Sequence, residues 1–360
     1  MYNSLDVFSG IGGLSLALSG YATPVAFCEI DTPCRDTLTA LMSKGNLPKV
    51  PLLRDVRKLK RDCVGCDVDL ITAGFPCVGL SAAGLHQGFE NPQSALFFEL
   101  ARVIGEFRPA FLVLENVTEV VGHLGVVHRT LNELGYDIKW CVLSAAAVGA
   151  PHLRKRWFCL GERRGDPKVS CKAAQPAGPV APLPPWNPDD SRVGRMAPDS
   201  ANARDRMAML GNSVVPKCAR HAFEHLWRLS QPEGRQVTGE AYPHSGYTAG
   251  SEVYAMEPLA APCPAPPMRL ALDPSTYAAR GQGNMAMVKH RILTSPCSRT
   301  LWTTPRHGML RACHVLTTRT ARDLPTQIRF ERNTTGDRGG QVDASFVEQM
   351  MGYPAGWTEH

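Results

Sequence analysis

The chain has 360 residues, 44% of them hydrophobic and 20% charged, with a formal net charge of +6. These values are typical of a globular protein that is long enough for an enzymatic core and a second domain. No apolar run approaches the roughly 18–20 residues that cross a bilayer, and the N-terminal residues predict a strand and a turn rather than a signal peptide. We therefore expect a cytoplasmic protein and no membrane partner.

The first 165 residues alternate predicted strands and helices. Strands are expected at residues 4–8, 24–30, 68–74 and 110–117, helices at 14–20, 32–45, 94–107 and up to about residue 134, and a strand hairpin at 138–145 and 156–162. Strands this apolar are buried on both faces. The pattern predicts an α/β fold with a Rossmann-like, mostly parallel, doubly wound sheet.

The remaining chain changes in composition. Residues 166–200 are proline-rich and predict a linker, whereas residues 201–230 return to an ordered pattern. Residues 231–360 predict a second, smaller, irregular or β-rich region, in which residues 280–340 are rich in arginine. Such clusters suit contacts with phosphates and base edges, although a solvated basic face explains the charge equally well.

Cysteines are numerous but scattered. The chain has 12 of them, mostly in apolar segments, as is usual in a reducing compartment. Cys63 and Cys66 form one CxxC pair, and no second pair follows at zinc-ligand spacing. We therefore predict no metal.

The stretch DVFSGIGG at residues 6–13 places a glycine-rich turn after the first strand. Such a turn lets a nucleotide-like ligand approach the backbone. Ser15 stands where the GxGxxG fingerprint has its third glycine, which favours a nucleoside ligand over a pyrophosphate. Glu29 closes the second strand and can hold ribose hydroxyls. A tight turn and a solvated acid are the alternative interpretation.

Three further motifs carry candidate catalytic groups. Cys77 follows the third strand in GFPCVGLS, where Pro76 and several glycines favour an accessible nucleophile under a mobile loop. Glu115 ends the fourth strand and, partly desolvated, could deliver a proton to a ring nitrogen, or it could cap the next helix. Arg154 and Arg156 share a face of an extended segment and could grip an oxyanion, or lie on a surface strand.

Together and in this order, the motifs resemble the S-adenosylmethionine-dependent DNA (cytosine-5)-methyltransferases of phages and bacteria. The resemblance covers about residues 4–160 and 205–228 and rests on DVFSGIGG, EID (29–31), DV (55–56), GFPCVGLS (74–81), ENV (115–117), PHLRKR (151–156) and GNSVVP (211–216). The C-terminal FVEQMMGYPAGWT is similar to endings common in this branch.

The resemblance implies methyl transfer from S-adenosyl-L-methionine to C5 of a cytosine flipped out of double-stranded DNA. It implies that Cys77 adds to C6, that Glu115 protonates N3, and that Arg154 and Arg156 hold the base. The implied cofactor-binding residues are Phe8, Gly10, Ile11, Gly12, Gly13, Glu29, Ile30, Asp55, Val56, Pro76, Asn212 and Val214. The implied DNA-binding residues are Ser81, Arg306, Arg311, Arg319 and Arg322.

The chain departs from the family pattern in three ways. Val78 and His152 stand where the family usually has glutamine, and the latter change predicts a weaker supporting hydrogen bond. The long target-recognition region that usually precedes the Gly-Asn-Ser-Val motif is missing there. We therefore predict a catalytic domain of residues 1–165 plus 201–230, a linker at 166–200, and target recognition in residues 231–360.

Two other functions stay open on the sequence alone. A tRNA cytosine-5 methyltransferase would share the chemistry, although the Cys-Phe-Thr motif usual in that branch is missing. A catalytically idle relative would bind DNA or cofactor only, but it would not need Cys77, Glu115 and Arg154 intact. Our first expectation is a monomeric DNA-modifying enzyme that acts in the cytoplasm, at the nucleoid, of a bacterial or phage-infected cell.

Overall fold

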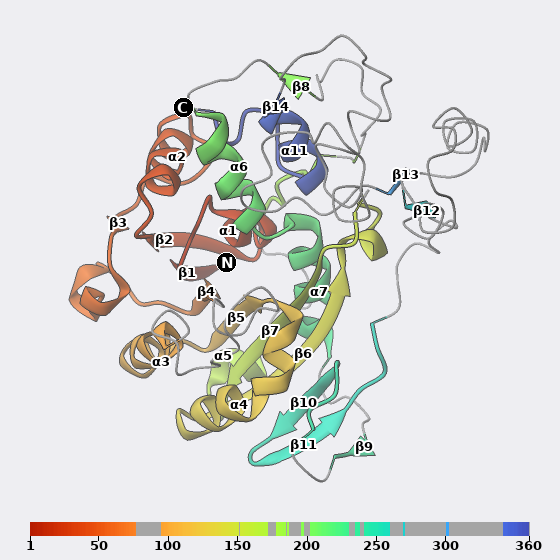
Figure 1. Ribbon diagram of the computed structural model, residues 1–360. Coiled ribbons are helices and arrows are strands. Elements are labelled where there is room, and N and C mark those ends of the chain that lie inside the picture. Colours follow the sequence, from red (N-terminus) through yellow and green to blue (C-terminus); the bar gives the residue numbers. More distant parts are fainter. Residues whose placement is uncertain are drawn as a thin grey trace.

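A central β-sheet organises the chain (Figure 1). The computed structural model describes residues 1–76, 95–150, 152–171, 178–184, 186, 196–197, 202–229, 235–237, 241–259, 269–270, 300–301 and 341–359. Within these residues the sheet has ten strands in the order β3-β2-β1-β4-β5-β7-β6-β10-β11-β9. The strands are β1 (Tyr2–Val7), β2 (Ala22–Cys28), β3 (Leu52–Leu53), β4 (Leu70–Gly74), β5 (Phe111–Asn116), β6 (Tyr136–Ser144), β7 (Lys155–Arg163), β9 (Arg235–Gln236), β10 (Gly246–Ala249) and β11 (Glu252–Ala255).

The first five strands of this order are parallel, and β7 runs antiparallel to both β5 and β6. This confirms the α/β class, the mostly parallel sheet and the predicted hairpin. The helices are α1 (Gly13–Ala17), α2 (Thr32–Ser43), α3 (Leu96–Phe107), α4 (Leu124–Glu133), α5 (Pro167–Ser170), α6 (Ala203–Asn212), α7 (Pro216–Arg228) and α11 (Ala344–Met351). Four two-residue strands form two small ladders apart from the main sheet. One pairs β12 (Arg269–Leu270) with β13 (Thr300–Leu301), and the other pairs β14 (Gln341–Val342) with β8 (Met196–Ala197).

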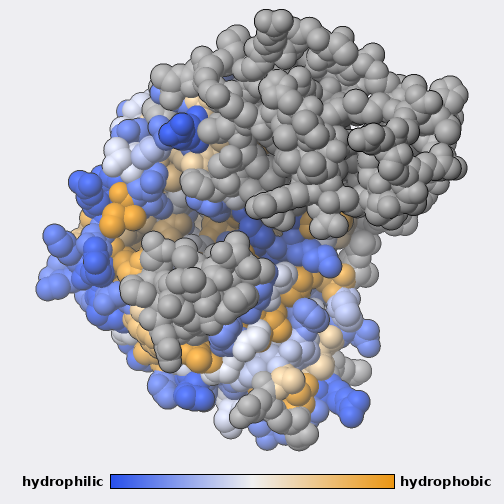
Figure 2. Space-filling view, in the orientation of Figure 1, coloured by the Kyte–Doolittle hydropathy of each residue, from blue (hydrophilic) through white to orange (hydrophobic). Residues whose placement is uncertain are grey.

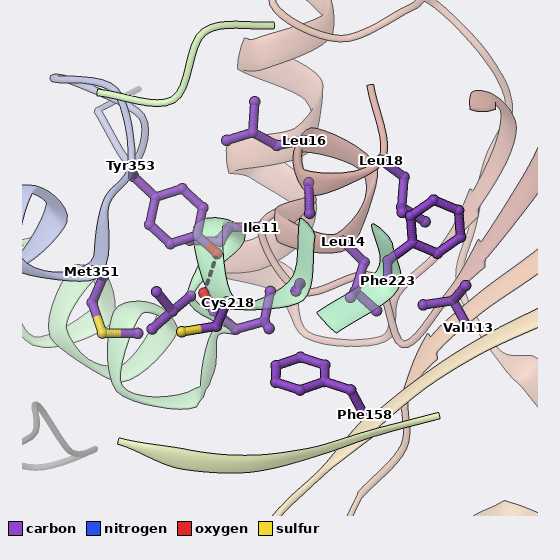
Figure 3. Packing of buried hydrophobic residues seen from close by; sticks show 14 of the residues in the cluster. Ile11, Leu14, Leu16, Leu18, Val113, Phe158, Cys218, Phe223, Met351 and Tyr353 are labelled. Atoms are coloured by element: carbon purple, nitrogen blue, oxygen red, sulfur yellow. Dashed lines mark hydrogen bonds between the residues drawn. The ribbon is translucent and has the colours of Figure 1, made fainter. Parts of the chain in front are cut away.

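Helices cover both faces of the sheet. Alternate residues of a strand point to opposite sides, so each face presents apolar side chains that the helices bury. In β5, Phe111 and Val113 join a buried cluster with residues of α1, α6, α7 and α11, whereas Leu112 and Leu114 join a second cluster with residues of α3 and α4. Figure 3 shows the first cluster, in which side chains from widely separated parts of the chain meet.

The C-terminal residues belong to this core rather than to a separate body. Phe346, Met350, Tyr353 and Trp357 are each at most 3% exposed within the first cluster. The β10–β11 hairpin continues the main sheet beside β6. The predicted boundary at residue 231 therefore does not mark the edge of the packed core, while the recognition role assigned to residues 231–360 stays a prediction.

Part of the predicted linker also packs on the core. The backbone N–H of Ala181 donates to Ser19 Oγ at 2.9 Å, and Trp186 Nε1 donates to the carbonyl of Met350 at 3.1 Å. Among the described residues no helix is both long and apolar enough to cross a membrane. On the face seen in Figure 2, apolar residues lie scattered among hydrophilic ones.

Candidate active site

The turn after β1 holds an unusual backbone conformation. Phe8, Gly10 and Gly12 have φ values of 54°, 52° and 78°, in the left-handed region. Such a φ strains phenylalanine and suits glycine. Ser9 stabilises the turn, because its hydroxyl donates to the carbonyl of Asp6 at 2.7 Å and accepts the backbone N–H of Cys28 at 3.1 Å. These hydrogen bonds connect the start of the turn to the end of β2.

Glu29 follows β2 and is 9% exposed. Its Oε2 accepts the backbone N–H of Gly10 at 2.7 Å, and its Oε1 accepts that of Asp31 at 2.8 Å. Burial raises the pKa of the Glu29 carboxyl, and these two backbone donors oppose the shift. Each carboxylate oxygen keeps a further lone pair, so the group can still accept hydrogen bonds from a vicinal diol.

A pocket of ≈ 480 Å³ lies beside Ile30, which is 55% exposed. An exposed large apolar side chain at a pocket suits the face of a planar base. Asp55, which also lines the pocket, accepts the backbone N–H of Arg57 at 3.0 Å and pairs with its guanidinium at 2.9 Å, which lowers the pKa of Asp55. The residues lining the pocket are Ile30, Leu53, Arg54, Asp55, Lys58, Leu59 and Cys63.

Two glycines of the turn face different surroundings. A Cβ on Gly10 would meet nothing within 4 Å, whereas one on Gly13 would lie 2.7 Å from Val214 Cγ1 and closer still to the Tyr353 hydroxyl. Gly10 therefore leaves space that a ligand can use. Gly13, by contrast, is required by internal packing against residues 200 or more positions away.

Glu115 lies opposite Gly74 in the register of β5 with β4. A Cβ on Gly74 would lie 3.3 Å from Glu115 Oε2, so glycine leaves room for the carboxyl group. Arg156 Nε lies 3.1 Å from Glu115 Oε1. Burial raises the pKa of Glu115, and the charges of Arg156 and then Arg154 oppose the rise. This arrangement suits a carboxyl group that takes and releases a proton.

The two arginines have different partners. Arg154 is 4% exposed and donates to the carbonyls of Gly211 at 3.0 Å and Ser213 at 2.6 Å. Burial, with the charge of Arg156, lowers its pKa to about 9. Arg154 therefore ties the start of β7 to the Gly-Asn-Ser-Val loop, whereas Arg156 meets the Glu115 carboxyl.

His152 is fully buried between Arg154 and the C-terminal helix. The backbone N–H of Arg154 donates to His152 Nδ1 at 3.3 Å, so Nε2 carries the proton and donates to the carbonyl of Met350 at 3.0 Å. Burial and the charge of Arg154 lower the pKa of His152 to about 3, so the ring is neutral. The sequence predicts that histidine at position 152 weakens a supporting hydrogen bond. In the structure His152 makes a hydrogen bond to the carbonyl of Met350, 198 residues away.

Asn116 was not among the predicted site residues, although it lies in the ENV motif. It is 2% exposed, its Nδ2 donates to the carbonyl of Phe75 at 3.2 Å, and its Oδ1 accepts the backbone N–H of Val117 at 2.8 Å. The side chain therefore holds the chain just beyond β4, two residues before Cys77. The signal in the sequence was an asparagine at the end of an apolar strand, within the same motif as Glu115.

The remaining predicted residues divide into two groups. Ile11, Val56, Pro76 and Val214 are buried or half-buried near these strand ends, with Ile11 in the first core cluster, and Asn212 is exposed at the end of α6. Cys77, Ser81, Arg306, Arg311, Arg319 and Arg322 lie outside the described residues.

Comparison with known proteins agrees with this geometry. Residues 2–184 match the model of the C-5 cytosine-specific DNA methylase family. The chain is 30% identical to the Type II methyltransferase M.CviJI of Paramecium bursaria Chlorella virus IL3A, over 98% of this chain and 96% of that protein. It is 34% identical to M.DsaV of Dactylococcopsis salina over 44% of each chain, and 32% identical to M.HhaI of Haemophilus parahaemolyticus over 43% of this chain and 47% of that protein.

Proposed function

The chain belongs to the C-5 cytosine-specific DNA methylase family, and we propose that it transfers a methyl group from S-adenosylmethionine to C5 of cytosine in double-stranded DNA, acting as a monomer. The observation that carries the proposal is the half-buried ion pair of Glu115 and Arg156, which lies beside Gly74 at the end of β4, three residues before Cys77. Its place of action would be the cytoplasm of a bacterial or phage-infected cell.

The residues at the β1 and β2 ends fit the cofactor. Glu29 would accept hydrogen bonds from the ribose, Ile30 would contact the adenine in the adjoining pocket, and the open side of Gly10 would leave room for the methionine part. Phe8, Ile11, Gly12, Asp55, Val56, Pro76, Asn212 and Val214 complete the proposed set. When bound, S-adenosylmethionine supplies an electrophilic methyl group.

The chain's own residues activate the base. The Cys77 thiolate would form a bond to C6 of the flipped-out cytosine, while Glu115 gives its proton to N3, so that charge does not accumulate in the ring. The ring becomes an enamine whose C5 can attack the methyl group. A base, which we take to be water, would then remove the C5 proton, the Cys77–C6 bond would break to release the thiolate, and N3 would return its proton to the Glu115 carboxylate, which restores the aromatic ring.

Arg156 supports the proton transfer at Glu115. A buried carboxylate without a partner would be costly, so burial alone would oppose the release of the proton. The Arg156 guanidinium, with its Nε 3.1 Å from Glu115 Oε1, stabilises the carboxylate that forms. Arg154, which donates to Gly211 and Ser213, acts as a positioning residue for this pair.

The experiment is an incubation of the protein with labelled S-adenosylmethionine and either double-stranded DNA or tRNA. We expect label in DNA with the native chain and none with Cys77→Ser, which removes the nucleophile. Bisulfite sequencing of DNA from cells that express the protein then reports the modified cytosines. Label only in tRNA would overturn the DNA substrate, and no label in either would show a catalytically idle protein.

Target recognition, we propose, uses the arginine-rich part of residues 231–342, with Ser81 near the flipped base. Deleting the whole stretch would remove β10, which pairs with β6, and the Pro243 carbonyl that accepts Trp140 Nε1–H at 3.0 Å. Replacing Arg306, Arg311, Arg319 and Arg322 by alanine is therefore the cleaner test. We expect weaker DNA binding with a smaller salt dependence and unchanged cofactor affinity. Unchanged DNA binding would show that these four arginines do not contribute to target recognition.

A further inference from the structure

The C-terminal segment, residues 343–359, contacts three parts of the candidate site at once. Trp357 Nε1 donates to the carbonyl of Ile11 at 2.8 Å, in the glycine turn. The Tyr353 hydroxyl donates to the carbonyl of Val214 at 2.9 Å, in the Gly-Asn-Ser-Val loop (dashed line in Figure 3). The carbonyl of Met350 accepts the Nε2–H of His152, which precedes Arg154.

The segment is itself held by a buried ionic group. Glu348 is 0% exposed, and its carboxylate pairs with Arg206 Nη2 of α6 at 3.1 Å. The same carboxylate accepts the backbone N–H groups of Gly356 at 3.0 Å and Thr358 at 2.8 Å. Because charge-assisted hydrogen bonds from two directions fix the carboxylate, the turn that carries Trp357 is fixed to α11 and α6.

The contact with Ile11 falls on the part of the turn that most needs support. Phe8 has a left-handed backbone conformation that strains a non-glycine residue, and such strain persists only where surrounding contacts impose it, while Gly10 and Gly12 adopt the same region beside Ile11. Glu29 accepts the backbone N–H of Gly10, and Trp357 donates to the carbonyl of the next residue, Ile11. Removing either contact should widen the range of conformations of the turn.

We propose that Trp357, whose ring packs against that of Tyr353, is a positioning residue for the cofactor-binding turn. The C-terminal segment would thereby set cofactor affinity. The inference rests on the proposed function, since it takes S-adenosylmethionine as the ligand of this turn. It assigns to the C-terminal segment a role in binding the cofactor in addition to packing in the core.

The test compares two tryptophans that undergo the same chemical change. Trp357→Phe removes the N–H that reaches Ile11 and keeps an aromatic ring. Trp186→Phe removes an N–H that reaches Met350 in the same segment, 3.1 Å away, and is the matched control. S-adenosylhomocysteine binding is measured by calorimetry on the full chain, and KM for the cofactor and kcat are measured at saturating DNA.

We expect Trp357→Phe to raise the Kd for S-adenosylhomocysteine and the KM for the cofactor by about 3- to 10-fold, with kcat within about twofold. Trp186→Phe should change Kd by less than about twofold. Equal effects of both substitutions on Kd would overturn the inference and leave the proposed function intact. A wild-type protein that does not bind S-adenosylhomocysteine would instead overturn the proposed function. If Trp357→Phe does not fold, Tyr353→Phe, which removes one oxygen atom, should raise Kd in the same direction, and an unchanged Kd there would overturn the inference.

Discussion

The parallel strands finish at one edge of the sheet, and carboxyl groups that are buried or half-buried lie at both ends of this edge with different partners. At the β1–β2 end, Asp6 accepts the Ser15 hydroxyl at 2.6 Å and Glu29 accepts backbone N–H groups. At the β5–β7 end, Glu115 meets the guanidinium of Arg156. Burial raises the pKa of all three carboxyl groups, but arginine charges oppose the rise only at Glu115.

This difference separates two tasks. Neutral donors at the β1–β2 end fix the direction of the carboxyl oxygens and the shape of the turn, which is what a binding surface needs. Cations at the β5–β7 end stabilise the ionised carboxyl, so that a proton can be released there and recovered. Under the proposed function the first end would bind the cofactor and the second would transfer the proton, and substitutions at each end can separate these two roles.

The largest expected effect is that of Glu115→Gln. The amide cannot deliver a proton, so the single-turnover rate of methyl transfer should fall by about 10²- to 10⁴-fold. Affinity for S-adenosylhomocysteine, measured by calorimetry, should stay within about twofold because Glu29 and its donors are unchanged. An equal loss of affinity would show that the two ends do not act separately.

Asp6 makes the stability of the β1–β2 end depend on pH. Burial raises the pKa of Asp6 from 3.8 to about 7, so the folded state holds this proton more tightly than the unfolded state does. The resulting stabilisation is complete below pH 4 and is lost as pH rises through about 7. Between pH 4.5 and pH 8 the native chain should lose about 3 kcal/mol of unfolding free energy relative to Asp6→Asn.

Urea unfolding of both chains at the two pH values measures this difference, and subtraction removes the titration of every other group. A difference that does not change with pH would mean that Asp6 stays ionised in the folded protein. The raised pKa of Asp6 would then be wrong, and with it the contrast between the Asp6 and Glu29 carboxyl groups, which accept from neutral donors, and Glu115.

Glu29→Gln should have the converse effect to Glu115→Gln. A glutamine offers one oxygen where two N–H groups, from Gly10 and Asp31, now donate, so one donor would face the amide nitrogen. We expect the KM for S-adenosylmethionine to rise by about 10- to 100-fold. The kcat at saturating cofactor should stay within about threefold, and a large fall in kcat alone would contradict the division of tasks.

The sequence predicted the positions of the carboxyl groups at the two ends of the sheet edge better than it predicted the contacts that fix them. Alternating apolar strands and helices placed Glu29 and Glu115 at strand ends on one edge of a parallel sheet, because strand order and direction follow from local patterns. The antiparallel β6–β7 hairpin was equally visible as two apolar runs. These features depend on residues that are close together in the chain.

The contacts of the C-terminal segment could not be predicted in this way. Trp357 and Ile11 lie 346 residues apart, and such a pairing leaves no periodic pattern in the sequence. The same holds for His152 with Met350 and for Gly13 with Tyr353, so Gly13 was assigned to the ligand on the strength of its motif alone. A glycine motif mixes residues that face a ligand with residues that face the protein, and only the fold separates them.

The smallest expected effect tests that separation at Gly13. A Cβ there would lie 2.7 Å from Val214 Cγ1 and still closer to the Tyr353 hydroxyl, so Gly13→Ala should destabilise the protein by about 1–3 kcal/mol. Tyr353→Phe should cost about 1 kcal/mol through its lost hydrogen bond to Val214. Because the phenylalanine also makes room for the methyl group, the double variant should lose less than the sum of the two.

Urea unfolding of the four chains gives the coupling, which we expect to be about 0.5–1 kcal/mol. Gly122→Ala is the matched control, since a Cβ at Gly122 would meet nothing within 4 Å and its backbone is not left-handed. Strict additivity at Gly13 and Tyr353 would mean that the methyl group is accommodated elsewhere. Gly13 would then not be required by packing against the C-terminal segment, and its place in the motif would have to be explained by the ligand, as is proposed for Gly10.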